Sequence, residues 1–482
     1  MWRAEDLREL DRRAVEGAGL PGAALMEVAG AAAAAVLRAR YPEARRVAVV
    51  CGPGNNGGDG FVVARRLRDD GLDAWIVLVA AADRVGGDAA TMLRVADALE
   101  VPRRDDLVGA EVVVDALLGT GAQGVPRPEI AAAIARIVQH GAPVLALDVP
   151  SGIDGSTGEV PGSAIRAACT VTFHGRKLGT AIEPGRSHAG TVVTVPIGLP
   201  RLFEPAAFAL RVDESDLVSL PPRDPLGTKY DAGSVLVVGG APGTSGAPLL
   251  AARAAFRAGA GAVFVAVSQD VRDQVAIGGA ELMVHGTRDP EQVLALAGRA
   301  DAVVLGPGLG RDDEAARLVD ELVARVECAL LLDADALYAL RGRLATLRRR
   351  PGATALTPHA GELARLLGVE RDVLSAARLA HVQEAAAEAG CSVLLKGPDT
   401  LIATPGAPLR VVETAVPGLA TAGAGDVLSG VVGALLARGL SPEDALSLGA
   451  AAHGAAAGRA ADAYGAFTAS DLERPLGELL GR

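Results

Sequence analysis

A glycine-rich segment between a strand-like run and a helix-like run most constrains how this chain folds. The segment reads Gly-Pro-Gly-Asn-Asn-Gly-Gly-Asp-Gly from residue 52 to residue 60, after the apolar run 47–50 and before the helical run 61–67. A strand, a glycine-rich turn and a helix together build a cradle for phosphates or nucleotides. We expect the glycines to bring the backbone close to a ligand and to take positive φ angles. The dinucleotide pattern Gly-x-Gly-x-x-Gly fits residues 52–57 but is weak, whereas the Asn-Asn-Gly-Gly-Asp core is much rarer.

Strand-like apolar runs alternate with helical patterns along most of the chain. They lie at 47–50, 74–79, 112–114, 144–147, 171–173 and 192–195, and then at 235–238, 263–267, 302–305, 329–332, 353–356 and 393–395. This alternation predicts an α/β fold with parallel strands. The proline-rich segment 220–228 interrupts it. We therefore predict two three-layer α/β domains, residues 1–212 and 229–482, joined by a linker over 213–228.

Composition and charge narrow the class of protein. The formal net charge of −11 without a sustained Lys/Arg block argues against a nucleic-acid partner. The start of the chain has charges of both signs and no apolar signal region, and the alanine-rich run 29–37 is too short for a membrane span. The four cysteines lie far apart, which argues against a zinc site or a disulfide framework. We expect a cytoplasmic protein with no membrane partner.

Polar residues in the first half stand directly after strand-like runs. Asp115 follows the run 112–114, and Asp148 follows 144–147 and leads to Ser151. Ligands of open α/β sheets bind beyond the carboxyl ends of the strands, so these residues and the asparagines at 55 and 56 are expected to face one crevice. Oxygen ligands from Asn, Asp and Ser suit an alkali or alkaline-earth cation. Any one of these residues alone is equally explained as a turn former.

The three segments GPGNNGGDG, DALLGTG and LDVPSGIDGSTG, in this order, closely resemble the NAD(P)H-hydrate epimerase domain of the YjeF N-terminal type, over roughly residues 1–210. The resemblance implies a Rossmann-like fold. It implies that Asn56, Asp115 and Ser151 hold K⁺ and that Asp148 contacts the substrate, and we select Asp148 as the acid and base. Lys177 matches a common lysine of this family, although a solvated loop lysine explains it equally well. The implied substrate contacts are Asn55, Asn56, Gly57, Gly58, Asp59, Gly119, Thr120, Gly121, Ala122, Gln123, Gly124, Val125 and Asp148.

The segment Thr-Ala-Gly-Ala-Gly-Asp at 421–426 is the strongest feature of the second half. It precedes the helical run 427–436, so its amides can form an anion hole for a transferring phosphoryl group. The aspartate in that first turn, Asp426, can accept a proton from a substrate hydroxyl. Alone, the same pattern is also an ordinary capped helix start.

Four further strand-end segments accompany it: LGPGLG at 305–310, LDADAL at 332–337, TPHAGE at 357–362 and KGPDT at 396–400. Together the set resembles the ADP-dependent NAD(P)H-hydrate dehydratase of the ribokinase-like superfamily, over roughly residues 228–460. The resemblance implies Asp426 as the catalytic base, Mg²⁺ with the nucleotide phosphates, and homo-oligomers. The implied substrate contacts are Ala247, Gly308, His359 and Asp426, and the implied contacts to ADP are Lys396, Gly397, Pro398, Asp399, Thr400 and Gly425. His359 is alternatively a structural turn histidine.

These features favour a bifunctional enzyme that repairs hydrated NADH or NADPH. The first domain would interconvert the R and S epimers, and the second would dehydrate the S epimer at the expense of ADP. One alternative is a ribokinase-like kinase for another small hydroxyl compound. The other is that the first domain only binds a nucleotide or a partner. The residues themselves do not distinguish ADP from ATP, or NADH hydrate from NADPH hydrate.

Overall fold

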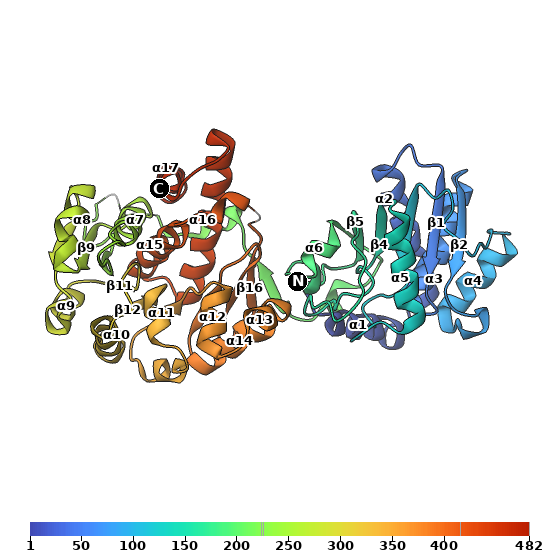
Figure 1. Ribbon diagram of the computed structural model, residues 1–482. Helices are drawn as coiled ribbons and strands as arrows, with labels where there is room; N and C mark the ends of the chain where they lie inside the picture. Colours follow the sequence, from blue (N-terminus) through green and yellow to red (C-terminus); the bar gives the residue numbers. More distant parts are fainter. Residues whose placement is uncertain (223, 225, 415, 482) are drawn as a thin grey trace. The chain divides into compact units, whose positions relative to one another are not determined.

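The computed structural model describes residues 1–222, 224, 226–414 and 416–481. The chain divides into two compact units, Met1–Ala209 and Leu210–Arg482 (Figure 1). Positions 223 and 225 of the predicted linker lie outside the described residues. Within that linker, Glu214–Ser219 form the 3-10 helix η5, and Glu214 bonds to Arg459 at 2.5 Å. This part of the predicted linker is therefore packed structure of the second unit.

The first unit is a parallel sheet with helices between its strands. Its strands are β1 (Arg46–Cys51), β2 (Asp73–Leu78), β3 (Val112–Ala116), β4 (Val144–Leu147), β5 (Cys169–Phe173) and β6 (Thr191–Val195). Its α-helices are α1 (Ala4–Arg12), α2 (Gly22–Arg40), α3 (Asn55–Asp69), α4 (Gly87–Ala98), α5 (Pro128–His140) and α6 (Arg186–Ala189). Short helical turns are η1 (Arg13–Gly17), η2 (Ala82–Arg84), η3 (Leu178–Thr180) and η4 (Arg201–Phe203).

The strand order β2-β1-β3-β4-β5-β6 places a switch point between β1 and β3, because the chain leaves β1 first toward β2 and then returns to β3 on the other side. Each of these neighbouring strands pairs in parallel. The connections after β1 and β3 therefore diverge at the carboxyl edge of the sheet. Such a divergence opens a ligand crevice in α/β folds.

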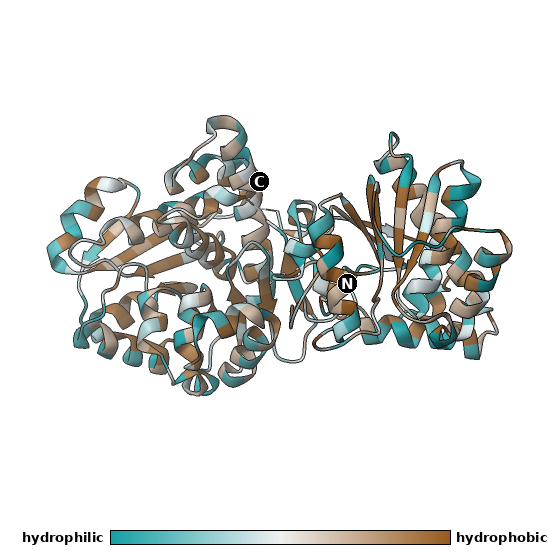
Figure 2. Cartoon of the chain, turned by 45° about the vertical axis from the view of Figure 1, so that its right-hand side comes forward, coloured by the Kyte–Doolittle hydropathy of each residue, from teal (hydrophilic) through white to brown (hydrophobic). Residues whose placement is uncertain are grey.

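Alternation along β1 separates two apolar cores. Val47 and Val49 pack with residues of α2, α3 and α4, whereas Ala48 and Val50 pack with Ile134 of α5 on the opposite face. Figure 2 shows the apolar colouring along the strands that supply both faces. The first unit therefore has the three-layer arrangement that the sequence predicts, since a parallel sheet must be covered on both sides.

Helix α2 is long and apolar enough to cross a membrane by length and composition alone. Its side chains of Leu25, Met26 and Leu37 are buried, and Met26 and Leu37 belong to the core that covers β1. A core helix of a soluble protein meets the same length and composition test. Packing against α3 accounts for the apolar composition of α2.

The second unit contains a larger mixed sheet. Its strands are β8 (Ser234–Val238), β9 (Ala262–Val267), β10 (Met283–Gly286), β11 (Ala302–Leu305), β12 (Ala329–Leu332), β13 (Thr354–Leu356), β14 (Ser392–Leu395), β15 (Thr400–Ala403) and β16 (Leu409–Val412), after β7 (Ala209–Arg211) at the division. Its α-helices are α7 (Gly246–Arg257), α8 (Arg272–Gly278), α9 (Pro290–Ala297), α10 (Asp313–Arg325), α11 (Asp335–Ala339), α12 (Ala360–Leu367), α13 (Arg371–Ala376), α14 (Arg378–Ala389), α15 (Ala424–Ala437), α16 (Pro442–Tyr464) and α17 (Glu473–Leu480). Further 3-10 turns are η6 (Gln269–Val271), η7 (Leu344–Arg349), η8 (Pro417–Leu419) and η9 (Ala469–Leu472).

This sheet has the order β10-β9-β8-β11-β12-β13-β14-β15-β16-β7. In this order, all neighbouring strands from β10 through β9 and β8 to β14 pair in parallel. Strand β15 pairs antiparallel with β14 on one side and with β16 on the other. Helices α7 and α15 cover β8 through a core that includes Val235, Ala251 and Val431. The second switch point lies between β8 and β11, and the glycine-rich segment after β11 starts there. The sequence did not predict β10 or β16, whose short runs lack a sustained apolar pattern.

Candidate functional site

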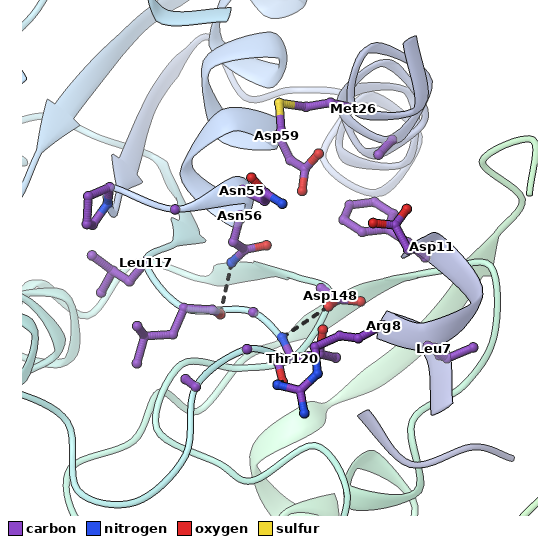
Figure 3. A pocket seen from close by; sticks show the side chains of 18 of the residues that line it. Leu7, Arg8, Asp11, Met26, Asn55, Asn56, Asp59, Leu117, Thr120 and Asp148 are labelled. Carbon is purple, nitrogen blue, oxygen red and sulfur yellow. Dashed lines mark hydrogen bonds between the residues drawn. The ribbon is translucent and has the colours of Figure 1, made fainter. Parts of the chain in front are cut away.

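A cavity of about 980 Å³ opens at the switch point of the first unit (Figure 3). Asn55, Asn56, Asp59 and Asp148 line it, together with the whole predicted segment Gly119–Val125. The connections after β1, β3 and β4 therefore meet at one crevice, as expected from the sequence. Gly57 and Gly58 are buried and are not among the lining residues.

The glycine-rich segment differs from its prediction in two respects. Helix α3 begins at Asn55, so the Asn-Asn-Gly-Gly-Asp core is the first helical turn and not a loop. None of the glycines in this segment has a positive φ. Packing requires four of the five, all except Gly54: for example, a Cβ on Gly57 would overlap the carbonyl oxygen of Gly52, and one on Gly52 would overlap that of Leu117. Small residues here let the start of α3 lie directly against the ends of β1 and β3.

Asn56, Asp115 and Ser151 converge beneath the cavity. Asp115 is fully buried and accepts hydrogen bonds from Ser151 N at 2.8 Å and Ser151 Oγ at 2.7 Å. Asn56 Nδ2 donates to the carbonyl oxygen of Leu118 at 2.9 Å, which leaves its buried Oδ1 without a protein partner. Burial raises the pKa of Asp115 to about 6, although the hydrogen bonds from Ser151 oppose this shift. The cluster thus combines an orphaned carbonyl oxygen with a carboxyl group that burial keeps from ionising easily.

Asp148 and Lys177 form a buried ion pair at the cavity wall. The ammonium group of Lys177 donates to Asp148 Oδ1 and, at 2.9 Å, to the carbonyl oxygen of Phe173. The second carboxylate oxygen of Asp148 accepts from Thr120 N at 3.3 Å. Asp148 has a φ of 66°, a left-handed conformation that costs a non-glycine residue about 1–3 kcal/mol and clusters at functional sites. The sequence left Lys177 undecided, because only the fold brings it to Asp148.

Further carboxyl groups face the same space (Figure 3). Burial raises the pKa of Asp59 well above its ordinary value, and the negative charges of Asp148 and Asp11 raise it further. Burial also raises the pKa of Asp11, with contributions from Asp88 and Asp148. These shifts favour the protonated form of both carboxyl groups. Asp11 comes from α1, which no motif in the sequence had connected with the site.

The second unit gathers polar side chains at the carboxyl ends of β12, β13 and β14. Lys396 Nζ donates to Asp333 Oδ1 at 2.9 Å, and Ser429 Oγ of α15 donates to Asp333 Oδ2 at 2.7 Å. Asp426 lies one helical turn before Ser429. Burial raises the pKa of Asp426 to about 7, with Asp333 adding to the shift and Lys396 opposing it. For Lys396, burial lowers the pKa, but the carboxylates of Asp333 and Glu362 outweigh it and the net pKa is raised.

Two predicted substrate contacts have clear local roles. His359 caps α12: its Nδ1 accepts from Gly361 N at 2.9 Å and from Glu362 N at 3.2 Å, so the ring proton must sit on Nε2. Gly308 has a φ of 61°, and Thr244 Oγ1 donates to its carbonyl oxygen at 2.8 Å. Thr244 also contacts a third predicted residue, Ala247 at the start of α7, whose N–H donates to Thr244 O at 3.3 Å.

The predicted ADP segment 396–400 turns from β14 into β15. Main-chain bonding sets Lys396 beside the His359 turn, since Lys396 N donates to Pro358 O at 2.9 Å. Gly425 lies close to the same lysine, because a Cβ on it would come 3.3 Å from Lys396 Nζ. Asp399 is fully buried and forms an ion pair with Arg378 at 3.1 Å. Its side chain therefore anchors the turn, and any contact with a nucleotide at this position falls to the backbone.

No group of three or more His, Cys, Asp and Glu side chains able to hold a metal ion occurs among the described residues. The predicted K⁺ site is of another kind, since two of its three members are Asn and Ser. Its buried Asn56 Oδ1, which lacks a protein partner, is the atom that a cation would satisfy.

Comparisons with known proteins agree with both halves of the chain. Residues 22–179 match the family described as YjeF-related protein N-terminus, and residues 235–476 match NAD(P)H-hydrate dehydratase. The bifunctional NAD(P)H-hydrate repair enzyme Nnr of Moorella thermoacetica is 38% identical, with 97% of this chain and 94% of that protein covered.

Solved structures resemble the second unit. The ADP/ATP-dependent NAD(P)H-hydrate dehydratase of Bacillus subtilis, co-crystallised with ATP and Mg²⁺, is 29% identical at a TM-score of 0.50, with 56% of this chain and 98% of that chain covered. A ribokinase-like superfamily protein of Enterococcus faecalis shares the fold at 22% identity and a TM-score of 0.52, with 57% of this chain and 96% of that chain covered. With the first unit matched to the YjeF type and the second to the dehydratase, the chain belongs to the family of bifunctional NAD(P)H-hydrate repair enzymes.

Proposed function

We propose that this protein restores hydrated NADH and NADPH, with an epimerase site in the first unit and an ADP-dependent dehydratase site in the second. The observation that carries the proposal is the presence of two separate strand-end sites, each built around one placed carboxyl group. Asp148 stands in the first-unit cavity beside Lys177, and Asp426 stands at the start of α15 beside the Lys396–Asp333 pair.

In the epimerase site, Asp148 serves as acid and base. The hydroxyl group on C6 of the hydrated ring lies next to the ring nitrogen, whose lone pair can expel it once an acid protonates the leaving oxygen. Water then adds to the opposite face and returns a proton to the carboxylate, so one carboxyl group serves both directions. Lys177 holds Asp148 in place and supplies an exchangeable proton beside it. Asp59 lines the same cavity, where burial favours the protonated form of its carboxyl group.

The residues of the proposed K⁺ site fit that ion. Asn56 Oδ1 lacks a protein partner, and hydrogen bonds link Asn56 through Leu118 and Ser151 to Asp115 in one cluster. Neutral oxygens and a single carboxylate suit a large monovalent cation. The ion would supply positive charge beneath the segment Gly119–Val125 and favour the ionised form of Asp115.

In the dehydratase site, Asp426 removes the proton from the C6 hydroxyl of the S epimer. The hydroxyl oxygen then attacks the terminal phosphorus of ADP, and AMP leaves. The ring nitrogen expels the new phosphate ester as inorganic phosphate, and loss of a C5 proton restores the reduced nicotinamide ring. The amides at the start of α15, including that of Gly425, stabilise the charge on the transferring group.

Lys396 and the turn that follows it would hold the nucleotide, and Mg²⁺ would neutralise its phosphates. Lys396 suits this role because flanking carboxylates keep it protonated. The oxygens of Asp333 are engaged by Lys396 and Ser429, so this carboxylate orients the site and is not left open as a ligand.

The proposal is tested by giving the protein a mixture of R and S hydrated NADH with ADP or with ATP. Full recovery of NADH absorbance requires both sites. The Asp148→Asn variant should stop when the S epimer is exhausted, and the Asp426→Asn variant should recover no NADH while still interconverting the epimers. A stable phosphorylated product in place of NADH would overturn the dehydratase assignment, and failure of the wild type to consume the R epimer would overturn the epimerase assignment.

A further inference from the structure

Helix α1 forms one wall of the first-unit cavity although it precedes the residues that match the YjeF family. The match begins at residue 22, whereas Leu7, Arg8, Asp11 and Arg12 of α1 all line the cavity. Figure 3 shows Arg8 extending from α1 toward Thr120 and Asp148. The cavity therefore includes side chains from α1, ahead of the residues that the family model matches.

Most basic side chains of the cavity are already neutralised by carboxylates. The pairs are Arg12 with Glu9 and Glu16, Arg84 with Glu129, and Lys177 with Asp148. Among the described residues, Arg8 and Arg127 line the same cavity without an ion pair of this kind. A dinucleotide that enters the cavity brings at least two negative phosphate charges, and the paired basic side chains are already neutralised by carboxylates. An arginine without a carboxylate partner can neutralise part of this phosphate charge.

Arg8 is the better placed of these two arginines. Its Nη1 donates to the carbonyl oxygen of Thr120 at 3.2 Å, within the segment Gly119–Val125. The N–H of the same Thr120 donates to Asp148 at 3.3 Å, so the guanidinium and the proposed acid–base group meet at one residue. A guanidinium has five N–H groups, and this contact uses one of them. The remaining fork matches the geometry of a phosphate.

We propose that Arg8 is a substrate-binding residue of the epimerase site, which holds a phosphate group of the hydrated dinucleotide. This inference rests on the proposed epimerase function. Two phosphate groups could accept these hydrogen bonds. The diphosphate bridge is present in both substrates, whereas the 2′-phosphate is present only in hydrated NADPH. Because the contact binds and does not react, its loss raises KM and leaves kcat nearly unchanged.

The test compares Arg8→Gln with Arg12→Gln and Arg127→Gln in the full chain. Epimer interconversion is followed by chromatography without ADP, so that the dehydratase site is silent. Arg8→Gln should raise KM about 10- to 100-fold, the loss expected for a charge-assisted hydrogen bond. Arg12→Gln is the matched control, since Arg12 lies one turn along the same helix, lines the same cavity and is paired with two glutamates. It should leave KM within about 2-fold.

Running hydrated NADH and hydrated NADPH in parallel identifies the phosphate. An equal rise in KM for both substrates supports contact with the diphosphate, and a rise confined to hydrated NADPH supports contact with the 2′-phosphate. The inference is overturned if Arg8→Gln leaves KM unchanged for both, if Arg12→Gln has the same effect, or if only Arg127→Gln raises KM. In each of these cases the proposed epimerase function still holds if the wild type interconverts the epimers. If the wild type does not interconvert them, both the epimerase function and this inference are wrong.

Fluorescence and the dehydratase reaction show whether each variant is folded. The two tryptophans of the chain, Trp2 and Trp75, both lie in the first unit, so their emission reports on that unit alone. Dehydration of pure S epimer with ADP should be unchanged in all three variants. Arg8→Lys, which keeps the charge but not the fork, should give a KM between those of the wild type and Arg8→Gln.

Discussion

Lys177 donates a hydrogen bond to Asp148 although the two residues are 29 positions apart in the chain. Asp148 stands at the end of β4, and Lys177 stands just beyond β5, the neighbouring strand. Their contact places a fixed positive charge beside the carboxyl group that we assign as acid and base. Removing one partner would leave the other charge buried without compensation, which typically costs about 3–5 kcal/mol.

The first prediction concerns this pair. Asp148→Asn should lower the rate of epimer interconversion about 10²- to 10⁴-fold, because the amide cannot transfer a proton. Lys177→Met should lower it as well and should also destabilise the first unit. Tryptophan emission during urea unfolding and chromatography of the epimers measure the two effects. Dehydration of pure S epimer is the internal control, and equal loss of both activities would contradict the division of labour between the units.

The second prediction concerns the proposed K⁺ site and its dependence on pH. Burial raises the folded-state pKa of Asp115 from 3.8 to about 6. Because the folded pKa is the higher one, the contribution of Asp115 to stability is full below pH 3.8 and is lost as the pH rises through about 6. A bound cation favours the ionised carboxylate, so K⁺ should stabilise the first unit more at pH 8 than at pH 5.

The measurement exchanges KCl for choline chloride at constant ionic strength during unfolding followed by tryptophan emission. At a K⁺ concentration ten times its Kd, the gain at pH 8 should be about 1.4 kcal/mol. Asn56→Ala should remove the response to K⁺, since it deletes the oxygen that lacks a protein partner. An equal response at both pH values would argue against a site that includes Asp115.

The third prediction concerns Asp426. As a base it must be ionised, and burial raises its pKa to about 7. The kcat/KM for dehydration of S epimer should therefore rise about tenfold per pH unit below this value and level off above it. Asp426→Asn should lower kcat/KM about 10²- to 10⁴-fold without destabilising the unit at pH 8, where the buried carboxylate is itself unfavourable.

Lys396→Met sharpens this test. The Lys396 charge lowers the pKa of Asp426, so its removal should move the midpoint of the pH profile upward, at saturating ADP. NADH absorbance gives the initial rates between about pH 5.5 and pH 9, the range that brackets this group. If Lys396→Met leaves the midpoint of the pH profile unchanged, the ionisation that controls the rate is not that of Asp426.

The fourth prediction separates two roles of His359. Its Nδ1 caps α12 through the N–H groups of Gly361 and Glu362, so His359→Ala should cost about 0.5–2 kcal/mol. Asn is a preferred capping residue, so His359→Asn should keep the stability of the wild type. If His359 also contacts the substrate, as the resemblance to the dehydratase implies, His359→Asn should raise KM for the S epimer several-fold. Thermal unfolding by circular dichroism and dehydratase kinetics measure the two roles, and wild-type kinetics in a stable His359→Asn variant would leave only the cap.

Local sequence determined the layout of this protein because strands, turns and helix starts depend on neighbouring residues. The apolar runs at 144–147, 302–305 and 329–332 coincide with β4, β11 and β12 residue for residue. The polar residues at strand ends were therefore predictable members of a site, since parallel strands end at a common edge. The fold class and the family followed from the same motifs.

Tertiary structure decided which of these residues face a ligand and with what charge. It made the Asn-Asn-Gly-Gly-Asp segment the first turn of α3, where close packing of Gly57 against Gly52 and of Gly58 against Met26 requires the small residues. It turned Asp399 inward to Arg378, brought Lys177 to Asp148, and placed Arg8 of α1 over Thr120. These contacts join residues far apart in sequence, and burial and charge depend on such neighbours, which no local pattern encodes.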